Sequence, residues 1–236
     1  METPTPPIWM EPPPERRPTL GRDEIVRAGI EVADEGGAGA LTMAAVARRL
    51  GPFTPMALYR YVRNKDGLVD LMLDAVNGEV ELPSAPSGDW RADLRALATR
   101  TWKMLERHPW AADLVHTRPP VGPNALRRLE FMLATFTALG ESAGAAMGYA
   151  ALIDRLVIGL ALQEAEERRH GRDEAFSTPE TTRAALEPLR ELVASGDGYP
   201  TIARWVADPS GPGPDELFQL GLDCLLDGIA ARLGNP

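Results

Sequence analysis

A short stretch of the chain is rich in basic side chains and lacks acidic ones. Residues 41–65 hold no Asp or Glu, and their basic residues are Arg48, Arg49, Arg60, Arg63 and Lys65. The whole chain carries a net charge of −9, so this stretch is locally positive within an acidic protein. Cationic side chains bind nucleic-acid phosphates, and arginine also binds guanine through two hydrogen bonds. The stretch therefore predicts a nucleic-acid contact; chance clustering on a solvated helix face is the alternative.

Helical periodicity divides this stretch into two short helices joined by a glycine-containing turn. The first is expected at residues 42–50, with the Thr42 hydroxyl as its N-terminal cap. The second is expected at residues 55–62, with Thr54 as the cap and Pro55 at the first helical position. Two short helices around a tight turn are typical of a helix-turn-helix, whose second helix enters the major groove of DNA.

The second helix has one face suited to packing and another suited to DNA. Leu58 and Val62 lie one turn apart and are expected to pack inward. On the other side, Arg60 suits guanine and Met56 suits a thymine methyl, while Lys65 in the next helix suits a phosphate. The alternative is that the tyrosines of this helix are core aromatics and its arginines are solvated. The predicted DNA-binding residues are Thr42, Thr54, Pro55, Met56, Ala57, Tyr59, Arg60, Tyr61 and Lys65.

The rest of the chain also reads as helix. No window shows the alternation that a half-buried strand needs, so we expect an all-α fold. Seven prolines in residues 1–18 predict a disordered arm outside the fold. A Pro/Ser-rich break at residues 82–88 then separates an N-terminal three-helix helix-turn-helix DNA-binding domain, residues 19–81, from a larger C-terminal helical domain, residues 88–236. Further helices are expected at residues 22–35, 65–80, 89–107, 109–115, 123–139, 142–169, 179–194, 201–207 and 214–233, with loops at 171–178 and 207–214.

Two stretches carry a specific family resemblance: LTMAAVARRLG at residues 41–51 and ALYRYVRNKDGL at residues 57–68. Through them, residues 25–73 closely resemble the DNA-binding domain of the tetracycline-repressor (TetR) family of bacterial regulators. The segment 52–57 is one residue longer than the usual family spacing, and Gly67 stands where a better helix former is common. The resemblance implies phosphate contacts by Thr42, Tyr59 and Lys65, and base contacts by Met56, Ala57, Arg60 and Tyr61.

The remainder is similar, less sharply, to the C-terminal domain of the tetracycline-repressor subgroup. The similar segments are WRADL at residues 90–94, HPW at 108–110, GPN at 122–124 and GLDCLLDGI at 221–229. In that family the second domain binds a small ligand between its helices, and two long helices of each subunit form a dimerising four-helix bundle. The resemblance therefore implies a ligand-binding and dimerisation domain, an unidentified small-molecule effector and a homodimer.

The last predicted helix has small residues three and four apart among leucines, a pattern that permits close helix approach. The alternative is that these residues contact the chain's own core. The predicted dimer-interface residues are Leu217, Leu220, Gly221, Cys224, Leu225, Gly228 and Ile229.

Aromatic, sulfur-bearing and polar residues of the second domain supply candidates for a ligand site. For any one apolar candidate, a place in the core is the commoner outcome, and His116 is the better polar candidate. The predicted ligand-binding residues are Trp102, Leu105, His108, Trp110, His116, Phe131, Met132, Thr135, Phe136 and Asp154.

Other function classes find little support. The chain has no His-Glu-x-x-His, glycine-rich phosphate loop or Gly-x-Ser-x-Gly motif, so we expect no enzyme and no cofactor. Cys224 is the only cysteine, which excludes an intrachain disulfide and a cysteine-based metal cluster, and no metal is expected. The longest apolar run, Leu156–Leu162, is far shorter than the roughly 18 residues of a membrane span.

These observations together predict a ligand-responsive transcriptional regulator of the bacterial cytoplasm, associated with the nucleoid when bound to DNA. The expected form is a homodimeric repressor that binds double-stranded, palindromic operator DNA and is released by a small molecule. The alternative is a helical interaction or small-molecule-binding protein without DNA binding.

Overall fold

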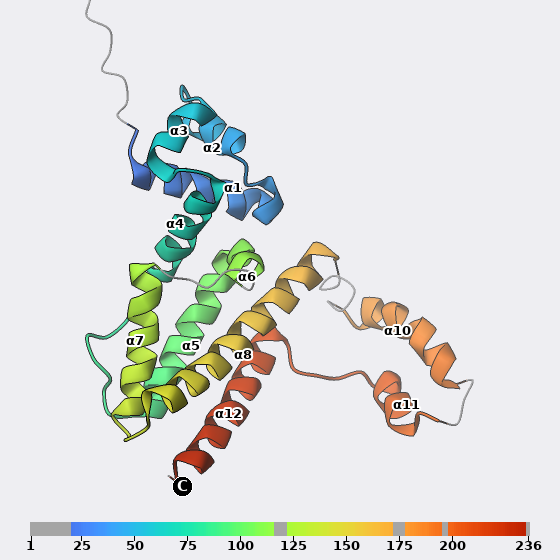
Figure 1. Cartoon of the computed structure of the whole chain (residues 1–236). Helices are drawn as coiled ribbons and strands as arrows, with labels where there is room; N and C mark the ends of the chain where they lie inside the picture. The colour runs from blue at the N-terminus through green and yellow to red at the C-terminus, as the bar shows by residue number, and fades with distance from the viewer. Residues whose placement is uncertain (1–19, 116–121, 172–177, 195–197, 235–236) are drawn as a thin grey trace, which may run out of the picture.

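The computed structural model describes residues 20–115, 122–171, 178–194 and 198–234 (Figure 1). All regular secondary structure in these ranges is helical, which confirms the predicted all-α fold. The predictions for the arm at 1–18, for His116 and for most of the loop 171–178 lie outside the described residues.

The N-terminal domain consists of α1 (Arg22–Ala40), α2 (Met43–Leu50), α3 (Pro55–Val62) and α4 (Lys65–Asn77). Side-chain caps fix two of the starts: the Thr42 hydroxyl accepts the N–H of Ala45 at 3.1 Å, and the Asn64 side chain accepts that of Gly67 at 2.8 Å. The predicted end of the first helix at residue 35 is close to an actual break at Gly37, whose φ is +73°. The remaining residues to Ala40 continue as a short helical piece.

The C-terminal domain is built around one long helix. Its helices are α5 (Trp90–Arg107), α6 (Pro109–Val115), α7 (Pro123–Thr137), α8 (Ala143–Arg169), α10 (Pro179–Ala194), α11 (Pro200–Ala207) and α12 (Pro214–Leu233). Helix α8 packs against α5, α6, α7 and α12, whereas α10 and α11 pack on each other to one side of these helices (Figure 1). Two helices, α4 and α7, end slightly before their predicted ends.

Helix α8 is long and apolar enough to cross a membrane, judged by length and composition alone. The central helix of a helical domain meets the same test, and α8 lies against four other helices of its domain. Yet only 28% of its most apolar 18-residue window is buried within the single chain. Much of α8 is therefore left open by its own domain.

Two carboxylates join the DNA-binding domain to the C-terminal domain. Asp34 of α1 accepts the indole N–H of Trp110 at 2.6 Å and lies 2.7 Å from Nδ1 of His108. Asp74 of α4 accepts the backbone N–H groups of Asn124 and Ala125, at 2.9 and 3.1 Å, and so caps the start of α7. Both contacts hold α1 and α4 in a fixed position on the larger domain.

The connection from α3 to α4 is a very tight turn. Arg63 has φ +60° and ψ −58°, and the N–H of Asn64 donates to the carbonyl of Val62 at 2.7 Å, which is the geometry of a γ-turn. The turn brings the Val62 carbonyl oxygen to 2.4 Å from the place where a Cβ on Gly67 would lie. This close approach explains why glycine occupies a helical position that otherwise favours a larger residue.

Gly67→Ala is therefore expected to destabilise the protein. Alanine is normally favoured over glycine in a helix by about 1 kcal/mol, but here its Cβ meets the Val62 carbonyl, so we expect a net loss of about 1–3 kcal/mol. Urea unfolding at fixed protein concentration measures the change. Gly39→Ala is the control, because a Cβ at Gly39 meets nothing within 4 Å. A gain of stability in Gly67→Ala would show that the turn relaxes without strain.

Candidate nucleic-acid interface and ligand cavity

The outer face of α3 is set by the burial of its inner face. Leu58 and Val62 are 0% and 2% exposed and pack into the core of the N-terminal domain. Met56 is 73% exposed, and Tyr59 and Tyr61 are each 38% exposed. The alternative that these tyrosines are core aromatics is therefore wrong. Together with the exposed side chain of Arg60, they form an open face on the second helix of the helix-turn-helix.

One of the five clustered cations is paired with acidic side chains of the same chain. Arg49 forms ion pairs with Glu31, at 3.2 Å, and with Glu35, both on α1. The hydrogen bond from Arg49 lowers the pKa of Glu35, so this carboxylate stays charged and remains paired with the arginine. The other cations of the stretch, Arg48, Arg60, Arg63 and Lys65, are exposed and have no acidic partner among the described residues. A positive surface therefore remains around α3.

The start of α3 differs from the prediction in one contact. The Thr54 hydroxyl makes no capping hydrogen bond; instead the Thr54 carbonyl accepts the N–H of Ala57 at 2.9 Å. Pro55 occupies the first helical position, as predicted. The exposed Thr54 hydroxyl is left without a capping role, next to the open face of α3.

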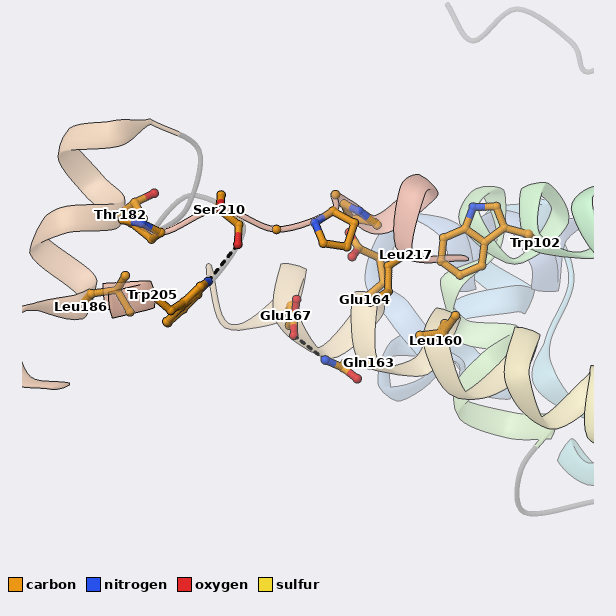
Figure 2. Close-up of a pocket in the computed structure, with 15 residues that line it drawn as sticks. Trp102, Leu160, Gln163, Glu164, Glu167, Thr182, Leu186, Trp205, Ser210 and Leu217 are labelled. Atoms are coloured by element: carbon orange, nitrogen blue, oxygen red, sulfur yellow. Dashed lines mark hydrogen bonds between the residues drawn. The ribbon is translucent and has the colours of Figure 1, made fainter. Parts of the chain in front are cut away.

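The C-terminal domain contains a cavity of about 480 Å³, within the size range of small-molecule sites. Its walls come from α5, α8, α10, α11, the segment before α12 and the first turn of α12 (Figure 2). The labelled lining side chains are Trp102, Leu160, Gln163, Glu164, Glu167, Thr182, Leu186, Trp205, Ser210 and Leu217.

Trp102 is the one predicted ligand-binding residue, among those the structure describes, that lines this cavity. Leu105 borders a separate space of about 20 Å³, enough for about one water molecule. Five of the other candidates are buried in the core away from the large cavity, and their contact with a ligand stays a prediction: Trp110, Phe131, Met132, Thr135 and Phe136.

The polar candidates His108 and Asp154 have partners within the chain. His108 is 8% exposed and lies between Asp34 and Glu79, with ring-nitrogen distances of 2.7 and 3.3 Å. Asp154 accepts two hydrogen bonds from Arg128, at 2.7 and 2.9 Å. Both residues therefore serve internal contacts in this structure, and neither lines the large cavity.

The predicted dimer residues of α12 separate into two groups. Leu217 and Leu220 are 40% and 53% exposed, Cys224 and Gly228 are also exposed, and Leu225 is half-buried. In contrast, Ile229 is 2% exposed and packs in the chain's own core, so its contact with a partner protomer stays a prediction.

Gly221 also faces the interior of the chain. A Cβ at Gly221 would lie 3.1 Å from Leu156 of α8, so this glycine permits a close approach of α12 to α8 within one chain. A Cβ at Gly228 meets nothing within 4 Å. The two glycines, which look alike in the sequence, therefore face different surroundings.

Both parts of the chain match known families. Residues 25–72 match the family described as bacterial regulatory proteins, tetR family, and residues 82–233 match the tetracyclin repressor-like, C-terminal domain. The chain belongs to the tetR family of transcriptional regulators. The first match contains the helix-turn-helix, and the second contains all the side chains that line the large cavity.

Individual tetR-family relatives match over nearly the full chain. An HTH-type transcriptional regulator of Saccharopolyspora erythraea is 38% identical, over 96% of this chain and 92% of the relative. The HTH-type transcriptional repressor DrrR1 of Streptomyces coeruleorubidus is 36% identical, over 90% and 78% respectively. The structure of ActR from Streptomyces coelicolor in complex with actinorhodin has a TM-score of 0.75 and 26% identity, covering 92% of this chain and 100% of ActR. ActR has been solved in complex with (S)-DNPA as well as with actinorhodin.

Several cavity residues were not among the sequence-based candidates. Glu164 and Glu167 lie on α8, where a run of charged residues reads as a solvated helix end. Trp205 lies on the short α11, whose helical pattern is weak. Trp205 is 44% exposed, but this exposure is visible only in the structure, so the sequence gives no signal for this wall of the cavity.

Proposed function

We propose that the protein is a transcriptional repressor that binds a palindromic operator as a homodimer and is released by a small molecule. It acts without catalysis, in the bacterial cytoplasm. The observation that carries the proposal is the open face of α3, where exposed Met56, Tyr59 and Arg60 lie among cations that have no internal acidic partner in the described residues. Such a face suits base edges and phosphates of a major groove.

The proposed roles follow from position on this face. Thr42 caps α2, Lys65 begins α4, and both side chains are exposed at helix N-termini, where phosphates are favoured. Tyr59 is the third proposed phosphate contact. The proposed base contacts are Met56, Ala57, Arg60 and Tyr61, and Thr54 and Pro55 complete the proposed DNA-binding residues. The proposed DNA-binding domain spans residues 19–81, and the proposed ligand-binding and dimerisation domain spans residues 88–236.

The large cavity is the proposed effector site. It is bordered by Trp102 of α5 and Leu160 of α8, two helices that also pack on the rest of the domain. The related ActR has been solved with actinorhodin, which supports a small organic effector for this chain. By linkage, the factor by which the effector lowers operator affinity equals the factor by which operator lowers effector affinity.

The test is binding to the DNA upstream of the protein's own gene, measured by fluorescence anisotropy and footprinting. We expect a two-fold symmetric footprint with half-sites about 34–36 Å apart, or a multiple of the helical turn. An asymmetric site bound by one protomer would contradict the dimeric repressor. Absence of sequence-specific binding would instead favour a helical interaction protein without DNA binding.

Gly228→Leu is expected to weaken the proposed dimer. Because Gly228 is exposed next to Cys224 and Leu225 and faces open space within its own chain, a leucine there overpacks only a contact with a partner. We expect the dimer to lose about 1–3 kcal/mol, measured by sedimentation equilibrium. The matched variant is Gly221→Leu, which should reduce the stability of the protomer through its clash with Leu156. An unchanged dimer constant in Gly228→Leu would remove this face from the interface.

A further inference from the structure

Two indole rings form parts of the cavity wall that are already fixed in place. The indole N–H of Trp102 donates to Asp215 at 2.8 Å, and its ring stacks on Phe218 at a centroid distance of 4.9 Å. The indole N–H of Trp205 donates to the carbonyl of Ser210 at 2.9 Å. Since the polar atom of each indole is already bonded, the part of each ring that reaches the cavity is apolar. Trp205 is 44% exposed and presents most of this aromatic surface, whereas Trp102 is 3% exposed.

The polar side of the cavity is acidic. Glu164 and Glu167 of α8 lie between the two tryptophans in Figure 2, and the lining side chains among the described residues include no Arg, Lys or His. Glu164 has a loose ion pair with Arg168, at 3.8 Å, which itself does not line the cavity. Glu167 accepts a hydrogen bond from the neutral amide of Gln163 at 2.9 Å. The cavity therefore presents carboxylates whose charge is compensated little by the part of the chain that the structure describes.

The carboxyl group of Glu106, near this end of the cavity, is influenced by the same negative charges. The pKa of Glu106, on α5, is raised by burial and further by the negative charges of Asp215 and Glu164, while Arg168 and Lys103 act in the opposite direction. Burial, the largest cause, disfavours charge of either sign, but the contributions of Asp215 and Glu164 come from their negative charges. These two carboxylates repel a further negative charge near Glu106 and attract a positive one.

The geometry points to a flat aromatic molecule with a cationic nitrogen as the ligand of this cavity, with its ring against Trp205 and its nitrogen near Glu164 and Glu167. This inference rests on the proposed function only in taking the cavity as the effector site. A cation near an indole face gains additional attraction from the ring. An anionic ligand of the same shape would face two carboxylates, with no cation among the described lining residues to balance its charge.

A matched pair of probes tests the charge. 9-Aminoacridine and acridine-9-carboxylate share one tricyclic ring and carry opposite charges at neutral pH. Binding to the full-length protein without DNA is followed by calorimetry and tryptophan quenching, because acridines also intercalate into DNA. We expect 9-aminoacridine to bind about tenfold or more tightly than the carboxylate, and Glu164→Gln and Glu167→Gln each to reduce this preference severalfold.

Glu191→Gln is the control, because Glu191 is an exposed acid of α10 that does not line the cavity. It removes the same charge and should leave the preference unchanged. Binding of neither probe, equal binding of both, or a preference that survives the two lining variants would overturn the inference. Operator binding is measured separately without probe, so a chain that binds 9-aminoacridine as expected but no operator would refute the proposed repressor and not the ligand class.

Discussion

We expect Arg60→Ala to relax operator specificity more than it reduces general DNA affinity. Arg60 lies on the open face of α3, four residues after the exposed Met56 and without an acidic partner in the described residues. A bidentate contact to guanine contributes about 1–3 kcal/mol of discrimination at one base pair. We expect the variant to lose that amount on the operator but little on random DNA, measured by anisotropy on the operator and on single-base-pair variants of it.

We expect Lys65→Ala, in contrast, to reduce general DNA affinity and to leave operator specificity unchanged. Its exposed ammonium group at the start of α4 is suited to a phosphate, which carries no sequence information. The variant should weaken binding to all sequences alike and lower the magnitude of the salt slope by about 1 per protomer. Affinity measured over a series of salt concentrations gives this slope directly.

Arg49→Ala is the matched control for both variants. It removes the same positive charge from the same stretch, but the Arg49 guanidinium is bound to Glu31 and Glu35 of α1. We expect neither the base preference nor the salt slope to change. The division of roles between Arg60 and Lys65 would be refuted if their two alanine variants behaved alike.

The helices of the DNA-binding domain could be predicted because their signals are local. The Thr42 cap, the proline at the start of α3 and the Asn64 cap each act within a few residues. The pairing of Arg49 with Glu31 and Glu35 could not be predicted, since the acids lie in another helix and only the packing of α1 on α2 brings them together. The requirement for glycine at position 67 could not be predicted either, because it arises from the Val62 carbonyl, which a tight turn brings close.

The ligand cavity was less predictable for a related reason. Large apolar side chains such as Phe131 and Phe136 are attractive candidates in a sequence, but the same property buries them in the core. The cavity is instead bordered by the charged end of α8 and by the segment before α12, which have no apolar periodicity to mark them. On α12, apolar residues occur around much of the helix, so the sequence could not tell the buried Ile229 from the exposed Leu220.

Asp154→Ala is expected to destabilise the protein strongly. The Arg128 side chain is 8% exposed and donates two hydrogen bonds to Asp154, and its Nε has no partner among the described residues. Removal of the carboxylate leaves a buried guanidinium without a counter-charge, which typically costs about 3–5 kcal/mol. Urea unfolding at one fixed protomer concentration measures the loss, since association of protomers would otherwise change the apparent stability.

The double variant Arg128→Met/Asp154→Leu tests whether the stability lost in Asp154→Ala comes from the unpaired buried charge of Arg128 and not from the loss of the ion pair itself. Because replacing a buried ion pair by apolar side chains of similar size is often neutral or stabilising, we expect it to recover most of the stability lost in Asp154→Ala. Glu187→Ala, which breaks the more exposed pair with Arg190, should change stability by less than about 1 kcal/mol. If Asp154→Ala were as mild as this control, Asp154 would not be held by Arg128 in solution, and its carboxylate would again be a candidate anchor for the effector.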